Sequence, residues 1–155
     1  MAVDRCLCFN LGLAHRKVAR AFEEALAPLG LTMAQAHFLS CLFQQDAMRP
    51  VDLSRSLGVD AGTLTPMIDR LERLHLIRRC PDPEDRRAAR ICLEDAAWRI
   101  KPELEDRLKG ATERLMGKFS PDEYASLLHL VQRLAGEEPD ATKVAAAAAA
   151  GGGTP

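Results

Sequence analysis

Hydrophobic side chains recur every three or four positions through most of the chain, a period typical of helices that bury one face. Residues 4–28 show this pattern and are predicted to form the first helix, with Asp4 capping its start. Thr32 and Gln35 have the spacing of a capping box, which predicts a second helix directly after Thr32. Pro50 suits the first position of a short third helix.

A further helix is predicted after a tight turn. Gly58 ends the third helix, and Asp60 is expected to cap a fourth whose leucine and isoleucine residues share one face. Pro66 lies about six residues into that helix, where proline removes a hydrogen bond and crowds the preceding turn. Two outcomes follow from the sequence: the helix begins later than Asp60, or it is kinked.

The pattern then changes to the alternation typical of strands. Residues 76–80 and 89–93 are predicted to pair as a β-hairpin, with the charged segment 82–87 as its tip. A long helix is expected over 94–117, and Ser120, followed by proline and glutamate, predicts the start of a last helix. The fold class is therefore mainly α with a small β-hairpin wing, in the order of a winged helix-turn-helix.

The composition of the chain limits the classes of protein to which it can belong. The chain has 155 residues, 47% of them hydrophobic and 28% charged, with a net charge of -1, which excludes an acidic disordered chain and a highly basic tail. No stretch reaches the roughly 20 apolar residues of a membrane span and no export signal is apparent, so we expect a cytoplasmic protein without a membrane partner. The five cysteines have no disulfide-framework spacing, which indicates free thiols in a reducing compartment.

Arginine is concentrated in the middle of the chain. All nine basic residues between positions 49 and 90 are arginines. By charge alone, a solvated face with incidental ion pairs is the commoner explanation. Their positions favour DNA instead, because a helix N-terminus fits the major groove and wing-tip arginines suit a narrow minor groove. The predicted DNA-binding residues are Arg55, Asp60, Thr63, Thr65, Pro66, Arg70, Asp85, Arg86 and Arg87.

Two stretches carry a family resemblance. Residues 60–66, followed by Leu71-Glu72 and residues 76–79, and the wing segment 82–87 together resemble the MarR family of dimeric winged helix-turn-helix regulators. The resemblance implies that Arg87 enters the minor groove and that Asp85 helps to hold it. It covers roughly residues 4–136.

The resemblance also implies a homodimer that binds double-stranded DNA at a pseudo-palindromic operator. The expected interface residues are Leu7, Leu11, Leu127, Leu130, Val131 and Leu134. The alternative is that these residues form only an intrachain core. The expected domains are an N-terminal dimerisation helix, the winged DNA-binding domain, the C-terminal dimerisation helices and a disordered low-complexity tail, over residues 1–32, 33–93, 94–136 and 137–155.

Cys8 is the candidate sensor of a signal. It lies near the start of the first predicted helix, where the N-terminal field stabilises a thiolate that can attack a peroxide and become a sulfenic acid. Residues 7–11 resemble the OhrR and MgrA branch of the family, in which oxidation of the matching cysteine releases DNA. Two tyrosines usual in that branch are replaced here by Gly12 and Phe22, and Met33 replaces an aromatic residue.

Cys6 is the second candidate redox residue. It could resolve an oxidised Cys8, link two subunits, form a mixed disulfide with a small thiol or bind a soft metal, and both residues could equally be inert. Residues two apart on a helix face nearly opposite sides, so an intrachain bond between them needs the helix end to unwind. Cys41 is expected in the core, and Cys80 and Cys92, on the two wing strands, in structural roles.

Three functions are compared. The leading one is a DNA-binding transcriptional regulator, a repressor, switched at Cys8 by an organic hydroperoxide or related oxidant. The second is the same fold released by a small phenolic or carboxylate effector, with the cysteines inert and His37 beside the pocket. The third is a thiol peroxidase. The sequence argues against it, because no residues suited to acid–base catalysis lie beside the cysteines. We therefore expect no enzyme, no cofactor and no metal.

Overall fold

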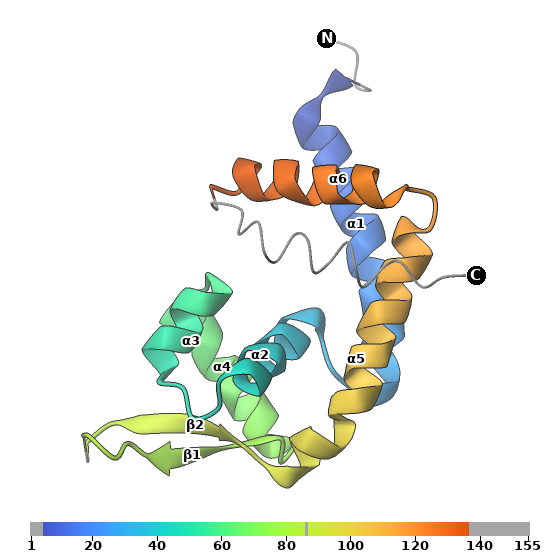
Figure 1. Ribbon diagram of the computed structural model, residues 1–155. Helices are drawn as coiled ribbons and strands as arrows, with labels where there is room; N and C mark the ends of the chain where they lie inside the picture. The colour runs from blue at the N-terminus through green and yellow to red at the C-terminus, as the bar shows by residue number, and fades with distance from the viewer. Residues whose placement is uncertain (1–4, 86, 137–155) are drawn as a thin grey trace. The chain divides into compact units, whose positions relative to one another are not determined.

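The computed structural model describes residues 5–85 and 87–136, which form six α-helices, a 3₁₀ turn and a two-stranded hairpin (Figure 1). The elements are α1 (Leu7–Leu26), η2 (Ala27–Leu29), α2 (Met33–Gln44), α3 (Pro50–Leu57), α4 (Ala61–Arg73), β1 (Ile77–Pro81), β2 (Ala89–Leu93), α5 (Asp95–Met116) and α6 (Pro121–Leu134). They divide into two compact units, with the boundary inside α5 after Leu108.

The first helix is shorter than its sequence predicts. It begins at Leu7, with Cys6 in the N-cap position, so the expected start at residue 4 is wrong, and Asp4 lies outside the described residues. It ends at Leu26, and the chain tightens into η2. The physical reason is Pro28, which has no N–H with which to continue the α-helical ladder.

The caps of the following helices are confirmed. The Thr32 hydroxyl and the Gln35 side chain form the reciprocal capping box of α2. Asp60 Oδ1 accepts a hydrogen bond of 2.8 Å from the Thr63 amide at the start of α4. Helix α4 then continues through Pro66, so the later start is wrong. The Asp60 cap fixes the start of the helix, and Pro66 removes only the one bond that its missing N–H would make to the Gly62 carbonyl.

The hairpin forms as predicted, except that its first strand begins and ends one residue later than expected, at Ile77 and Pro81. Strands β1 and β2 are antiparallel, with Ile77 opposite Leu93 and Pro81 opposite Ala89. Met48, in the loop before α3, adds an isolated bridge to Ile91 on β2. This bridge joins the hairpin to the start of the third helix.

The core of the first unit lies where α2, α3 and α4 meet the hairpin and the first half of α5 (Figure 1). Helix α4 contributes Leu64, Ile68 and Leu71, which are almost completely buried. Because these three residues occupy one face of the helix, the other face, with Thr63 and Arg70, is exposed to solvent. The largest fully buried side chains are Phe38, Leu26, Leu39, Leu42, Leu53, Leu71, Ile77, Ile91 and Leu104.

The second unit contains the end of α5 and α6. Ser120 and Glu123 form the capping box that the sequence predicts, and α6 runs from Pro121 to Leu134. Residues 137–155, for which a disordered tail is expected, lie outside the described residues. No single helix within residues 5–85 and 87–136 has both the length and the apolar character to cross a membrane, although Leu7–Leu29 and Met33–Gln44, bent by 71°, meet that test as a pair.

Candidate DNA-binding surface and cysteines

The start of α4 presents short polar side chains on a fixed backbone. The Thr63 amide holds the Asp60 carboxylate, and this hydrogen bond lowers the pKa of Asp60 below its usual value. A Cβ at Gly62 would lie 3.3 Å from the Asp60 carboxylate, so the absence of a side chain there leaves the cap undisturbed. Thr63, Thr65 and Pro66 are exposed, as the predicted contact surface requires.

Two of the predicted arginines lie beside this surface. Arg70 is exposed in the last turn of α4. Arg55 is exposed in the last turn of α3 and lies 3.4 Å from Asp52, a contact that water screens at the surface. Both guanidinium groups are therefore accessible to a ligand from solvent.

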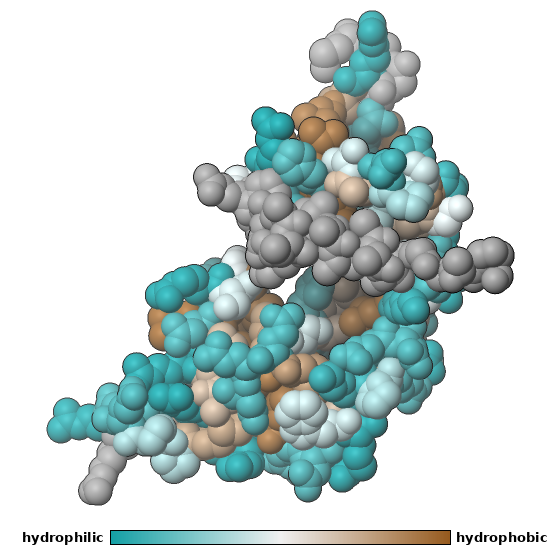
Figure 2. All heavy atoms as spheres, viewed as in Figure 1, coloured by the Kyte–Doolittle hydropathy of each residue, from teal (hydrophilic) through white to brown (hydrophobic). Residues whose placement is uncertain are grey.

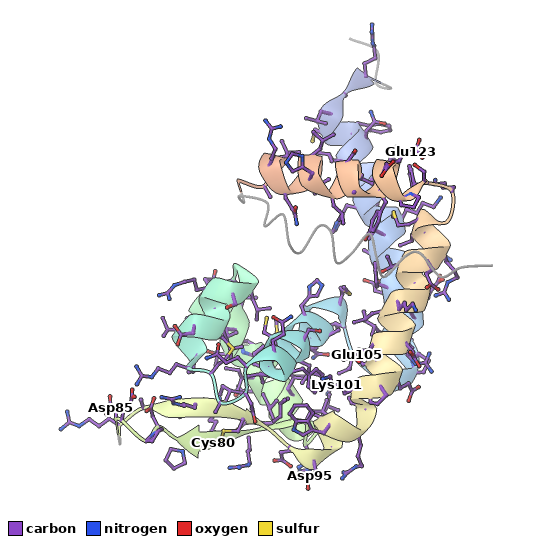
Figure 3. All side chains as sticks on the ribbon, viewed as in Figure 1. Cys80, Asp85, Asp95, Lys101, Glu105 and Glu123 are labelled. Carbon is purple, nitrogen blue, oxygen red and sulfur yellow. A yellow bond between two sulfur atoms is a disulfide. The ribbon has the colours of Figure 1, made fainter. Side chains whose placement is uncertain are left out.

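The tip of the hairpin is organised by Asp85. Its carboxylate accepts a hydrogen bond of 2.9 Å from the Arg87 amide, and its carbonyl accepts one of 2.9 Å from the Ala88 amide. Asp85 and Arg87 are both exposed, and Asp85 is at the free end of the hairpin in Figure 3. Arg86 lies outside the described residues. The turn thus presents the Arg87 side chain to solvent from a hydrogen-bonded backbone.

The start of the tip segment, directly after β1, contains an ion-pair cluster that sequence reasoning missed. The Asp82 side chain is fully buried; Arg49 Nε donates to its Oδ2 at 2.6 Å, and Arg90 Nε lies 3.1 Å from the same oxygen. Glu84 completes the cluster, 3.1 Å from Arg49 Nη2. The hydrogen bonds from Arg49, the Glu84 amide and Arg90 hold the pKa of Asp82 far below its usual value. No spacing in the sequence joins Arg49 to Asp82, which are 33 positions apart.

Arg79 is also engaged within the chain. Its Nη2 lies 2.9 Å from Asp69 Oδ1 and its Nε lies 3.1 Å from Glu72 Oε2, both on α4. Together with the Asp82 cluster, this contact shows that the central arginines fall into two groups. Arg49 and Arg79 fasten the hairpin to the helices, and Arg90 binds Asp82 within the hairpin. In contrast, Arg55, Arg70 and Arg87 face solvent.

The cysteines fall into two groups. Cys80 and Cys92 form a disulfide between the two wing strands, so the expectation that all five cysteines are free thiols is wrong. The register explains the bond, because it makes these two residues diagonal neighbours on one face of the hairpin. Cys8 is free and exposed, Cys6 is free and partly buried, and Cys41 packs against the core, where burial raises the pKa of its thiol.

Each of the expected interface residues carries an exposed apolar side chain. Leu7 on α1 is 62% exposed, and Leu130 and Leu134 on α6 are 59% and 58% exposed. Figure 2 shows hydrophobic residues on the surface towards the N-terminal end of α1. The remaining expected residues, Leu11, Leu127 and Val131, are exposed as well. Within the described part of its own unit, none of these side chains belongs to the buried core.

The fold and this surface define a winged helix-turn-helix protein: a helix capped at its start, packed beside a hairpin with a charged tip. Residues 31–89 match the model of the MarR family. The chain is 30% identical over 106 residues to the organic hydroperoxide resistance transcriptional regulator of Bacillus subtilis, with 68% of this chain and 72% of the relative covered.

Two further relatives extend the comparison. The regulator MgrA of Staphylococcus aureus is 30% identical over 132 residues, which cover 83% of this chain and 86% of that protein. A variant of Escherichia coli MarR solved in complex with operator DNA has a TM-score of 0.77 and 29% identity, covering 83% of this chain and 92% of its own. The chain belongs to the MarR family of transcriptional regulators.

Proposed function

We propose that this chain is a homodimeric repressor that binds a pseudo-palindromic operator and releases it when Cys8 is oxidised by an organic hydroperoxide or a related oxidant. The observation that carries the sensing step is the position of Cys8: it is exposed, and it lies in the first turn of α1. A thiolate is the nucleophile toward a peroxide, and an exposed thiol at this turn is accessible to one.

The DNA contacts in this proposal divide between α4 and the hairpin. Thr63 and Thr65 at the start of α4 meet base edges in the major groove, and Arg70 meets phosphate. Arg87 enters the adjacent minor groove, where a narrow groove concentrates negative potential. The exposure of all four side chains supports this arrangement.

The same proposal gives α1 two roles. Cys8 lies between Leu7 and Leu11, two of the residues assigned to the dimer interface. Oxidation adds a polar, bulkier group to this apolar surface. We propose that the change alters the packing of the two subunits, and with it the separation of the two DNA-binding lobes, residues 33–93 of each subunit.

A second candidate is release by a small phenolic or carboxylate ligand. The sequence favours it at one point: the tyrosines that accompany the sensing cysteine in the peroxide-sensing branch are Gly12 and Phe22 here, and the chain has a single tyrosine, Tyr124. His37 is exposed on α2 and is available to such a ligand.

The test measures binding to DNA from the chain's own promoter before and after one equivalent of an organic hydroperoxide, and again after a thiol reductant. The expected result is reversible release in the wild type and none in Cys8→Ser. Cys41→Ser is the matched control, because it removes a free thiol that packs against the core. Release that persists in Cys8→Ser would contradict the sensing role, and binding unaffected by the oxidant would favour the ligand.

A further inference from the structure

The Cys80–Cys92 disulfide joins the two strands of the hairpin across its face. Cys80 lies opposite Arg90 in the strand register and Cys92 lies opposite Arg78, with 6.3 Å between the two cysteine Cα atoms. That separation is within the range that disulfides span without backbone movement. Figure 3 places Cys80 on β1, between the helices and the free end that carries Asp85.

The bond encloses the whole tip of the hairpin. The loop that it closes contains residues 81–91, and therefore both Asp85 and Arg87. The tip lies beyond the last strand pair, Pro81 with Ala89, and an isolated two-stranded hairpin is only marginally stable in water. A cross-link restricts the conformations available to such a loop, so the bond selects the conformations in which the tip is already formed.

The disulfide is also connected to the ion-pair cluster, because Asp82, Glu84 and Arg90 lie within the loop that the bond closes. Arg90 lies opposite Cys80 and two residues before Cys92, on the same face of the sheet. Its guanidinium contacts the buried Asp82 carboxylate, which Arg49 holds from the start of α3. The bond maintains the strand register that brings Arg90 to Asp82. Because Asp82 also binds Arg49, the same register supports the contact between the hairpin and the start of α3.

The bond is within reach of reagents. Ile77, Ile91 and Leu93 are buried and lie on the opposite face of the hairpin from the two cysteines. Cys92 is 9% exposed, and Cys80 is only partly buried. A thiolate from solvent can therefore approach the Cys80 sulfur, the step that begins thiol–disulfide exchange.

We infer that Cys80 and Cys92 form a reversible thiol–disulfide site that sets the DNA affinity of the wing, separately from Cys8 and with the opposite sign. In the bonded state the tip is ordered before DNA arrives, and less ordering is needed on binding. In the dithiol state the hairpin loosens and affinity falls. The inference rests on the proposed DNA binding, but not on the proposed sensing by Cys8.

The chemistry balances with a hydroperoxide as oxidant and a dithiol as reductant. One cysteine thiolate attacks the peroxide, which leaves as an alcohol, and the resulting sulfenic acid is attacked by the second thiol with loss of water. In reverse, a thiolate of the reductant attacks Cys80, Cys92 leaves as a thiolate, and the second thiol of the reductant displaces Cys80 and closes its own disulfide.

The test uses a full-length chain with Cys6→Ser, Cys8→Ser and Cys41→Ser combined, which leaves the wing pair as its only thiols. The bonded and dithiol forms are identified by intact mass, since the bonded form lacks two hydrogen atoms, and each is titrated with operator DNA. The expected result is about tenfold tighter binding by the bonded form, the effect of ordering one or two long side chains in advance. Adding Cys80→Ser and Cys92→Ser should reproduce the weaker binding and remove any response to reductant.

Equal affinity of the two forms would overturn the inference, as would failure of cumene hydroperoxide to convert the dithiol into the bonded form. Hydrogen exchange of residues 81–91 in the wild-type chain gives a second measurement, with slower exchange expected in the bonded form. If neither form binds operator DNA, the proposed function fails and the effect on affinity fails with it. Slower exchange would then still show that the bond orders the wing, and equal exchange would overturn that part as well.

Discussion

Arg49 donates a hydrogen bond of 2.6 Å from Nε to Asp82 Oδ2, and this contact joins the residue that precedes α3 to the residue that follows β1. The Asp82 side chain is fully buried, whereas the Arg49 side chain is 39% exposed. A buried carboxylate requires partners, and Arg49, Arg90 and the Glu84 amide supply them. The Asp82 carboxylate, together with the Met48–Ile91 bridge, therefore ties the wing to the start of α3.

We predict that Asp82→Asn loosens the wing and weakens operator binding, because the amide keeps the shape but loses the charge that holds two guanidinium groups. Asp52→Asn is the matched control, since its carboxylate is partly exposed and lies 3.4 Å from Arg55 in a surface contact. Operator titrations of both variants measure the difference. Equal effects of the two substitutions would show that the buried position of Asp82 does not matter.

The same carboxylate predicts a pH dependence of stability. Its arginine and amide partners hold the pKa of folded Asp82 below the unfolded value of about 3.9. The stabilisation is therefore present above about pH 4 and is lost as the pH falls through the lower, folded pKa. Urea unfolding at neutral and acid pH should show wild type and Asp82→Asn converging only in acid; a constant gap would contradict this.

Replacing Arg87 should weaken binding without unfolding the chain. Arg87 is exposed at the wing tip, and the Asp85 carboxylate binds its backbone amide, which Arg87→Ala retains. We expect a loss of about tenfold or more in operator affinity and a salt slope lower by about 1. Lys109→Ala removes one positive charge from α5 and should change neither quantity. If both variants behave alike, net charge rather than the wing explains the loss.

The dimer prediction rests on exposed leucines of the last helix. Leu130→Glu with Leu134→Glu places charge on two side chains that are 59% and 58% exposed, so the helix itself should persist. We expect a monomer in sedimentation experiments and an operator affinity lower by roughly a hundredfold, the loss of a second linked contact. Val51→Glu, at a residue that is 59% exposed on α3, should remain dimeric. If the double variant is still a dimer, the interface does not include Leu130 and Leu134.

Leu71 is predicted to anchor the DNA-facing helix. It is fully buried on the core side of α4. Leu71→Ala should lower the free energy of unfolding by about 2–5 kcal/mol, through lost burial and the cavity that remains. Val51→Ala, at an exposed position, should stay within about 0.5 kcal/mol of the wild type. Urea denaturation measures both, and similar values would contradict the assignment of Leu71 to the core.

The local elements could be predicted because their signals lie within a few residues of one another. Thr32 with Gln35, Asp60 with Thr63, and Ser120 with Glu123 are contacts three residues apart, and all three caps form. The sequence predicts the start of α1 too early because Asp4, a suitable capping residue, lies close to the actual N-cap position at Cys6. Capping propensity is too weak a signal to choose between neighbouring positions.

Local patterns in the chain are sufficient to predict the order of the helices and the hairpin, the buried face of α4, and the charged tip that carries Asp85 and Arg87. Periodicity and capping decide these features, and both act over one or two turns of chain. Which arginines are available to a ligand depends instead on long-range packing. Arg49 meets Asp82 and Arg79 meets Asp69 across 33 and 10 positions, and such pairings depend on how the hairpin packs against the helices. The bond between Cys80 and Cys92 likewise depends on strand register, which composition and cysteine count do not contain.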